Sequence, residues 1–177
     1  MKSKSGPSKK LKGVGSEFAL VLHNIRSTHN VGSIFRTAEC AGVTGLYLCG
    51  YTPTPMDRFG RPRKDIAKVA LGAEDVVPWK HELSTSVLLK RLKKEGWRII
   101  ALEQAEYSVD YKKIKIGSKK GEKFLKNVLI LGNEVGGIEN SILKLCDHVA
   151  EIPLRGEKES LNVSVATGVA VFSMLGV

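Results

Sequence analysis

The 177-residue sequence lacks features that would place it among secreted or membrane proteins. Its three cysteines are too few and too widely spaced for a disulfide framework, so we expect reduced thiols and a cytoplasmic protein. No apolar run approaches the ~20 residues of a membrane span. The lysine-rich N-terminus also has no apolar stretch typical of a signal peptide. We therefore expect no association with a membrane.

The sequence patterns of several enzyme classes are missing as well. The four histidines have no cysteine or histidine partner at the spacing of a metal site, so we expect no metal. There is no Gly-x-Ser-x-Gly turn of a serine hydrolase and no Cys-x-x-Cys pair for redox chemistry. The Gly-x-Gly-x-x-Gly pattern of dinucleotide-binding folds is absent too, which argues against a Rossmann-type oxidoreductase.

Acidic residues are scarce relative to basic ones, and the net charge is +10. The excess lies mainly in three segments, residues 1–13, 57–68 and 112–126, and is not spread evenly. Such clusters attract a polyanion with an affinity that falls as salt rises. The alternative is a set of solvated lysine loops with no partner.

Apolar runs and helical patterns alternate along most of the chain. Residues 1–16 are rich in lysine, serine and glycine, so we expect a disordered tail before one domain at 17–177. Apolar runs predict strands at Phe18–Leu22, Gly45–Leu48, Trp97–Leu102, Val128–Leu131 and Val149–Ile152. Helical patterns cover Val31–Ala41, Asp65–Leu71, Ser84–Glu95 and Ile138–Cys146. This order indicates an α/β fold with a mainly parallel sheet flanked by helices.

The last predicted helix, Asn162–Leu175, has no broad polar face. A helix that is apolar all round must be covered on all sides. It could pack on the sheet with one face and on a second subunit with the other, which predicts a homodimer. A fully internal helix is the alternative.

Three segments combine polar side chains with strand ends. In Asn24–Arg36, Asn30 is well placed as a helix N-cap, and Arg36 lies among apolar or small residues and needs an anionic partner such as a phosphate. In Leu129–Ile138, a buried strand leads into a glycine-rich turn that carries Asn133 and Glu134. In Ile152–Ser164, Ser160 and Asn162 stand beside a helix that should be buried, where polar groups must be satisfied.

In this order, the three segments resemble the motifs of the SpoU family of RNA methyltransferases, within the SPOUT superfamily. Asn30–Arg36 matches the first motif, Leu131–Glu139 the second and Ile152–Ala166 the third. The resemblance implies a C-terminal trefoil knot, S-adenosylmethionine as cofactor and a homodimer with its active site near the subunit interface. The polar residues that the family uses in catalysis correspond to Asn30, Arg36, Glu134, Ser160 and Asn162. The cofactor pocket corresponds to Leu102, Gly132, Asn133, Ile152, Leu154 and Leu161.

The resemblance also implies methyl transfer to a ribose 2′-hydroxyl of tRNA or rRNA. We expect Arg36 to act as an electrostatic and orienting group, because a guanidinium with a pKa above ~12 rarely gives up its proton. Asn30, Ser160 and Asn162 would orient the ribose and Arg36, and Glu134 would position either Arg36 or Asn30. Two alternatives remain open: a non-catalytic RNA-binding protein with the same fold, and a SPOUT methyltransferase that acts on a base.

Overall fold

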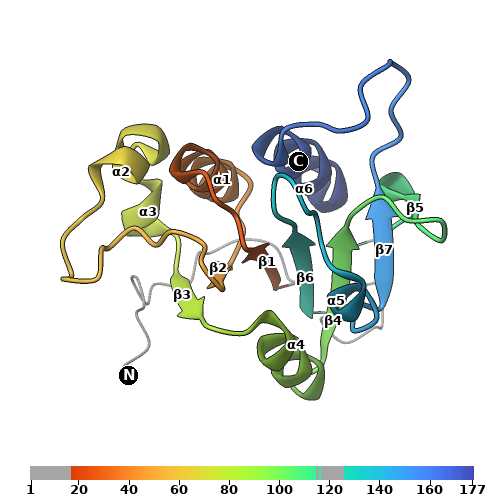
Figure 1. Cartoon of the computed structure of the whole chain (residues 1–177), viewed down its shortest axis with the longest axis horizontal. Coiled ribbons are helices and arrows are strands. Elements are labelled where there is room, and N and C mark those ends of the chain that lie inside the picture. Colours follow the sequence, from red (N-terminus) through yellow and green to blue (C-terminus); the bar gives the residue numbers. More distant parts are fainter. Residues whose placement is uncertain (1–16, 115, 117–125) are drawn as a thin grey trace.

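The computed structural model describes residues 17–114, 116 and 126–177 (Figure 1). The tail expected at 1–16 lies outside the described residues, as do most of the lysines between 112 and 126. In the described part, parallel strands form one sheet in the order β3-β2-β1-β6-β4-β7-β5. The prediction of an α/β fold with a mainly parallel sheet is confirmed.

All five predicted strands are present, and two short ones were missed. The strands are β1 (Phe18–His23), β2 (Gly45–Cys49), β3 (Trp79–Glu82), β4 (Trp97–Leu102), β5 (Val109–Asp110), β6 (Lys126–Leu131) and β7 (His148–Glu151). The helices are α1 (Thr28–Cys40), α2 (Lys64–Ala70), α3 (Ala73–Val76), α4 (Thr85–Lys94), α5 (Asn140–Leu143) and α6 (Val163–Leu175), with a 3-10 turn at Tyr111–Lys113. β3 was missed because three of its four residues are polar, and β5 because it has only two residues.

Helices cover both faces of the sheet (Figure 1). α1, α2, α3 and α6 lie on one face, and α4 and α5 lie on the other. β1 contributes side chains to the hydrophobic core on each face of the sheet, because side chains along a strand alternate between faces. Leu20 and Leu22 pack into the cluster that contains Ile34 of α1, and Val21 packs into the cluster that contains Leu88 of α4.

The strand order changes direction at β1 and β6, and this places two of the three motifs side by side. β1 lies between β2 and β6, and Leu22 of β1 pairs in register with Leu131 of β6. The segment after β1 carries the first motif, and the segment after β6 carries the second. Ligands of open α/β sheets bind at the carboxyl ends of the strands where the order reverses.

Two local predictions were wrong. The N-cap of α1 is Ser27, whose hydroxyl accepts a hydrogen bond from the Asn30 N–H at 3.3 Å, so Asn30 lies inside the first turn and its side chain is available for other contacts. The helix predicted at Ile138–Cys146 is limited to α5. It ends early because the chain turns into β7, where the Asp147 carboxylate accepts a hydrogen bond from the Ile99 N–H at 2.7 Å.

α6 is covered on one side only. Thr167, Ala170, Val171 and Met174 are buried, whereas Val165, Val169 and Phe172 are 52%, 38% and 38% exposed. The alternative of a fully internal helix is therefore wrong for this chain. None of the described helices is both long enough and apolar enough to cross a membrane.

Candidate active site

Asn30, Glu134 and Asn162, one residue from each motif, form a single hydrogen-bonded chain. The Asn30 side-chain amide donates to the Glu134 carboxylate at 2.8 Å. The Asn162 amide donates to the Asn30 side-chain carbonyl at 3.2 Å. The polar groups of Asn30 are thus held from both sides, and the arrangement brings together three side chains that the sequence separates widely.

Glu134 is fixed by the backbone as well as by Asn30. Its two carboxylate oxygens accept hydrogen bonds from the Arg26 N–H at 2.9 Å and the Ser27 N–H at 3.0 Å. Partial burial acts to raise the pKa of Glu134, but the hydrogen bonds from Arg26, Asn30 and Ser27 outweigh it and hold that pKa below its ordinary value. Glu134 therefore stays ionised and ties the turn after β6 to the start of α1.

Asn162 serves two elements at once. It is the N-cap of α6, where its side-chain carbonyl accepts hydrogen bonds from the Ser164 N–H at 2.9 Å and the Ser164 hydroxyl at 2.7 Å. Its amide group remains free to donate to Asn30. Asparagine suits this position because it offers an acceptor for the cap and a donor for the site.

The turn after β6 is compact because two glycines allow its ends to meet. The backbones of Asn133 and Gly137 exchange hydrogen bonds of 3.1 and 3.0 Å. A Cβ added at Gly132 would lie 2.6 Å from the Gly137 backbone carbon, closer than real contacts allow. Gly137 adopts a φ of +61°, which L-residues with a side chain rarely adopt.

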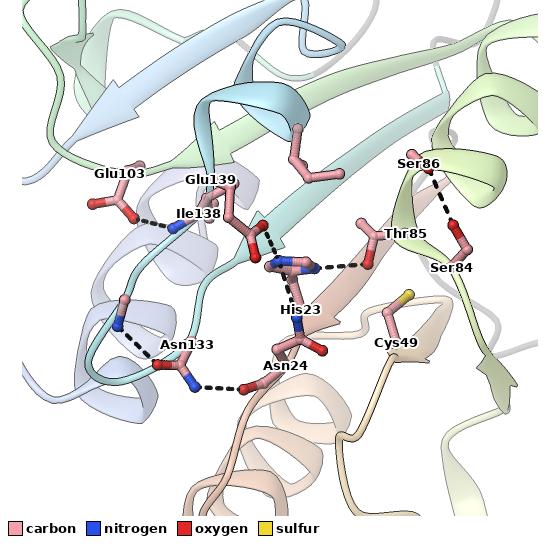
Figure 2. Close-up of polar contacts among 12 residues, drawn as sticks. His23, Asn24, Cys49, Ser84, Thr85, Ser86, Glu103, Asn133, Ile138 and Glu139 are labelled. Atoms are coloured by element: carbon pink, nitrogen blue, oxygen red, sulfur yellow. Dashed lines mark hydrogen bonds and ion pairs between the residues drawn. The ribbon is translucent and has the colours of Figure 1, made fainter.

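Side chains on either side of this turn hold it in place (Figure 2). Asn133 donates from its amide to the Asn24 carbonyl at 2.8 Å. The same amide donates to the Tyr51 hydroxyl at 3.0 Å, and the Asn133 side-chain carbonyl accepts from the backbone N–H groups of residues 135 and 136. On the opposite side, the Glu103 carboxylate accepts from the Ile138 N–H at 2.9 Å. The second motif is therefore braced by residues that follow β1, β2 and β4.

A buried histidine anchors the far end of the same segment. His23, 5% exposed at the end of β1, has its Nδ1 2.7 Å from the Thr85 hydroxyl and its Nε2 2.6 Å from a Glu139 carboxylate oxygen (Figure 2). Thr85 opens α4, and Glu139 precedes α5. These contacts connect both helices on one face of the sheet to β1, the strand that precedes the first motif.

A cleft of about 870 Å³ opens at the carboxyl ends of β4 and β6. Such a volume lies within the usual range for small-molecule sites, about 300–1,000 Å³. The predicted site residues that line it are Leu102, Gly132, Asn133, Glu134, Ser160, Leu161 and Asn162. A smaller adjoining hollow of about 140 Å³ includes Ile152 and Leu154 together with Leu102, Ser160 and Leu161. All six residues predicted to bind the cofactor thus gather around one region.

Two predicted catalytic residues, Asn30 and Arg36, do not line the cleft. Asn30 is hydrogen-bonded to Glu134 and Asn162, which do line it, whereas Arg36 makes no such contact. The Arg36 side chain is exposed on α1. No described residue forms a hydrogen bond or an ion pair with it. Of the two partners expected for Glu134, the single chain shows Asn30.

The sequence reasoning missed Glu103, the pair His23 and Glu139, and the contact of Tyr51 with Asn133. Glu103 had a usable signal, because it is an acidic residue directly after a buried strand. The other contacts span 82 to 116 positions of the chain, which no local pattern indicates. Among the described residues, no cluster of histidine, cysteine, aspartate or glutamate could hold a metal ion.

Comparisons with known proteins identify the family of this chain. The model of the SpoU rRNA Methylase family matches residues 17–172. The chain is 33% identical over 163 residues to the 23S rRNA (guanosine-2′-O-)-methyltransferase RlmB of Xanthomonas axonopodis pv. citri, covering 89% of this chain and 58% of that protein. It is 31% identical to RlmB of Pseudomonas aeruginosa, covering 91% of this chain and 59% of that protein.

Solved structures show the same fold. The crystal structure of an AdoMet-bound rRNA methyltransferase from Sinorhizobium meliloti matches with a TM-score of 0.78 and 29% identity, over 89% of this chain and 55% of that chain. The chain thus spans less than two thirds of the length of these relatives. The family match covers nearly all of the described residues, including the three motifs. The chain belongs to the SpoU family of RNA methylases.

Proposed function

We propose that this protein is an S-adenosylmethionine-dependent RNA methyltransferase that modifies a ribose 2′-hydroxyl of rRNA or tRNA. The observation that carries the proposal is the chain from Glu134 through Asn30 to Asn162 at the edge of a cleft of cofactor size. The relatives named above as guanosine-2′-O-methyltransferases of 23S rRNA support the ribose as the site of methylation and favour rRNA as the substrate.

The cleft suits the proposed cofactor in shape and charge. Its walls include apolar side chains, among them Leu102, Leu131 and Leu161, which fit an adenine ring. Its lining also contains Glu103, Glu106 and Glu134 and, among the described residues, no lysine or arginine. An acidic lining favours a cationic ligand. S-adenosylmethionine supplies a methyl group on a positively charged sulfur.

The polar chain would position the reacting ribose. Most of the gain in an in-line displacement comes from aligning the reacting atoms, and rigid hydrogen-bonded groups achieve this best. Asn30 is locked between Glu134 and Asn162, and Ser160 lies at the same cleft, so these side chains can hold ribose hydroxyls without reorganising. Arg36 would bind the neighbouring phosphate and stabilise negative charge that develops on the 2′-oxygen.

A homodimer would account for two exposed features near the site, the apolar face of α6 and the side chain of Arg36. Although one face of α6 is buried, the helix presents the apolar side chains of Val165, Val169 and Phe172 to solvent. These residues recur at intervals of three and four, which is one helix face. α1 packs beside α6 and carries the exposed Arg36. We propose that a second copy covers this face and that Arg36 acts near the interface. The trefoil knot implied by the family remains part of the proposal.

The net charge and the free thiols of the protein fit an RNA substrate in the cytoplasm. The net charge of +10 favours binding to a polyanion. All three cysteines are unpaired thiols, as expected in a reducing compartment. RNA is the proposed partner besides the second subunit.

Methyl transfer from radiolabelled S-adenosylmethionine to bulk rRNA and tRNA tests the proposal. We expect incorporation with the wild-type protein and a loss of at least about tenfold with Asn162→Ala, because the ribose-orienting chain is broken. Nuclease digestion followed by mass spectrometry should place the methyl group on the sugar. Cofactor binding without any transfer would favour the non-catalytic alternative, and a methylated base would favour the base-directed one.

A further inference from the structure

A second cavity, of about 860 Å³, lies at the carboxyl ends of β2 and β3, on the edge of the sheet that carries the candidate active site. It is formed between the segment that joins β2 to α2 and the start of α4 (Figure 1). Four of its lining residues are large apolar or aromatic side chains left strongly exposed: Tyr51 at 61%, Phe59 at 66%, Leu83 at 72% and Val87 at 65%. Exposed apolar side chains gathered in one hollow indicate a binding site.

The wall that carries Phe59 is a rigid turn. Met56 and Pro62 form an isolated bridge, and the Asp57 N–H donates to the Arg61 carbonyl at 2.8 Å. The Asp57 carboxylate accepts hydrogen bonds from the Phe59 N–H at 2.7 Å and the Arg61 N–H at 2.9 Å. These contacts hold the backbone at Phe59 in place, so the exposed ring is presented by a preorganised support.

Cationic groups surround this ring. The guanidinium carbons of Arg58 and Arg61 lie 4.7 and 5.0 Å from the centroid of Phe59. Arg61 is paired with Asp57, but Arg58 forms no ion pair with any other described residue. Residues 57–68 carry five basic and two acidic side chains. An aromatic ring flanked by arginines is the combination that binds unstacked bases of a nucleic acid, through stacking and through attraction to phosphates.

One hydrogen bond joins this cavity to the candidate active site. Tyr51 lines the cavity, and its hydroxyl accepts from the amide of Asn133 at 3.0 Å. Asn133 lines the cofactor cleft and stands next to Glu134 in the second motif. The hydrogen bond between Tyr51 and Asn133 therefore connects the wall of one hollow to the wall of the other.

We propose that the cavity between the Met56–Pro62 turn and α4 binds an unpaired base of the substrate RNA, from a nucleotide close to the methylated one. This inference rests on the proposed function for its substrate. The base would stack on Phe59 with its edge toward Leu83 and Val87, while Arg58 would contact a phosphate. The cavity would thereby select targets in which such a base is free of pairing.

Equilibrium binding of a labelled, short, mixed-sequence single-stranded RNA tests the proposal without requiring catalysis. We expect Phe59→Ala to weaken binding about tenfold, and Phe59→Trp to keep it, because stacking depends on an aromatic surface. Val87→Glu, on the opposite wall, should weaken binding as well by placing a negative charge in the cavity. The controls are Val76→Ala, which removes an exposed apolar side chain on α3, and Lys90→Ala, which removes an exposed positive charge on α4.

An oligoribonucleotide of the same length without bases separates stacking from general attraction to the backbone. We expect the wild type and Phe59→Ala to bind it equally. The proposal is overturned if Phe59→Ala binds the base-containing RNA as the wild type does, or if it loses affinity equally for both oligonucleotides. Failure of the wild type to transfer methyl groups would overturn the proposed function instead. The binding comparison would still show whether the cavity binds an RNA base. A cavity that captures a protein surface would leave RNA binding unchanged in Phe59→Ala and Val87→Glu.

Discussion

The Asn162 side-chain amide donates a hydrogen bond to the Asn30 side-chain carbonyl at 3.2 Å across 132 positions of the chain. This contact joins the segment after β7 to the first turn of α1. Because Asn30 in turn donates to Glu134, its amide group has one defined orientation. The three motifs are thus joined by hydrogen bonds, so a substitution in one motif is expected to affect the other two.

Replacement of Asn30 by alanine removes both contacts and leaves Glu134 and Asn162 without their shared partner. We expect a loss of stability of about 1–3 kcal/mol, together with a large loss of methyl transfer and little change in cofactor affinity. Urea denaturation, turnover and calorimetric titration of S-adenosylmethionine measure the three quantities. Glu39→Ala, on the exposed side of the same helix, is the control. Unchanged turnover in Asn30→Ala would remove the residue from the site.

Replacement of Glu134 by glutamine should lower stability in a pH-dependent way. The folded state holds the pKa of Glu134 below its ordinary value, so the charged carboxylate stabilises the fold above the unfolded pKa, about 4.3. That contribution disappears as the pH falls through the folded pKa. Because the side chain is exposed, we expect a deficit of at most about 1 kcal/mol at pH 7.

Denaturation of wild type and Glu134→Gln at pH 7 and at pH 3 measures this difference. The gap between the two proteins should shrink at the lower pH. Glu157→Gln, at an exposed position, is the matched control and should show no such gap. A deficit that stays constant with pH would mean that the ionised carboxylate is not responsible.

A methyl group at Gly132 should disrupt the turn after β6. Its Cβ would lie 2.6 Å from the Gly137 backbone, which cannot move without breaking the hydrogen bonds between residues 133 and 137. We expect Gly132→Ala to cost about 1–3 kcal/mol of stability and to weaken binding of S-adenosylmethionine. Gly136→Ala is the control in the same turn, because its nearest neighbour would be Asn133 Oδ1 at 3.8 Å. Equal stability and equal cofactor affinity of the two variants would contradict the proposed clash at Gly132.

Arg36 should matter for turnover and not for folding. It is exposed and has no partner among the described residues, so Arg36→Ala should change stability by less than about 0.5 kcal/mol. We expect turnover to be abolished and cofactor affinity to be retained. Arg36→Lys should restore little of the turnover, because an ammonium cannot bind a phosphate bidentately. Retention of most activity in Arg36→Ala would show that this assignment is wrong.

A charge on the exposed face of α6 should separate the proposed subunits. Phe172→Asp places a carboxylate in the apolar stripe without touching the buried face of the helix. Sedimentation equilibrium should report a dimer for the wild type and a monomer for this variant, with loss of turnover if the interface completes the site. Val76→Asp, at an exposed position on α3, should remain dimeric. A monomeric wild type at micromolar concentration would exclude a stable dimer.

Much of the fold follows from local pattern in the sequence. Runs such as Phe18–Leu22 and Val128–Leu131 are apolar because buried parallel strands are covered on both faces, and their alternation with helices indicates the class. The candidate polar residues of the site could be named because the three segments that carry them resemble the motifs of the family. Two errors arose where packing outweighed pattern, at the N-cap of α1 and at the shortened α5.

The sequence by itself indicated five of the seven strands in the described residues and the family, because these depend on side-chain patterns along the chain. Only the tertiary structure showed that Glu134 contacts Asn30 within the chain, and that Tyr51 and Glu103 brace the second motif. It also showed that α6 leaves one apolar face uncovered. The physical reason is that these contacts depend on strand order: β1, β6 and β4 are neighbours in the sheet but distant in the chain.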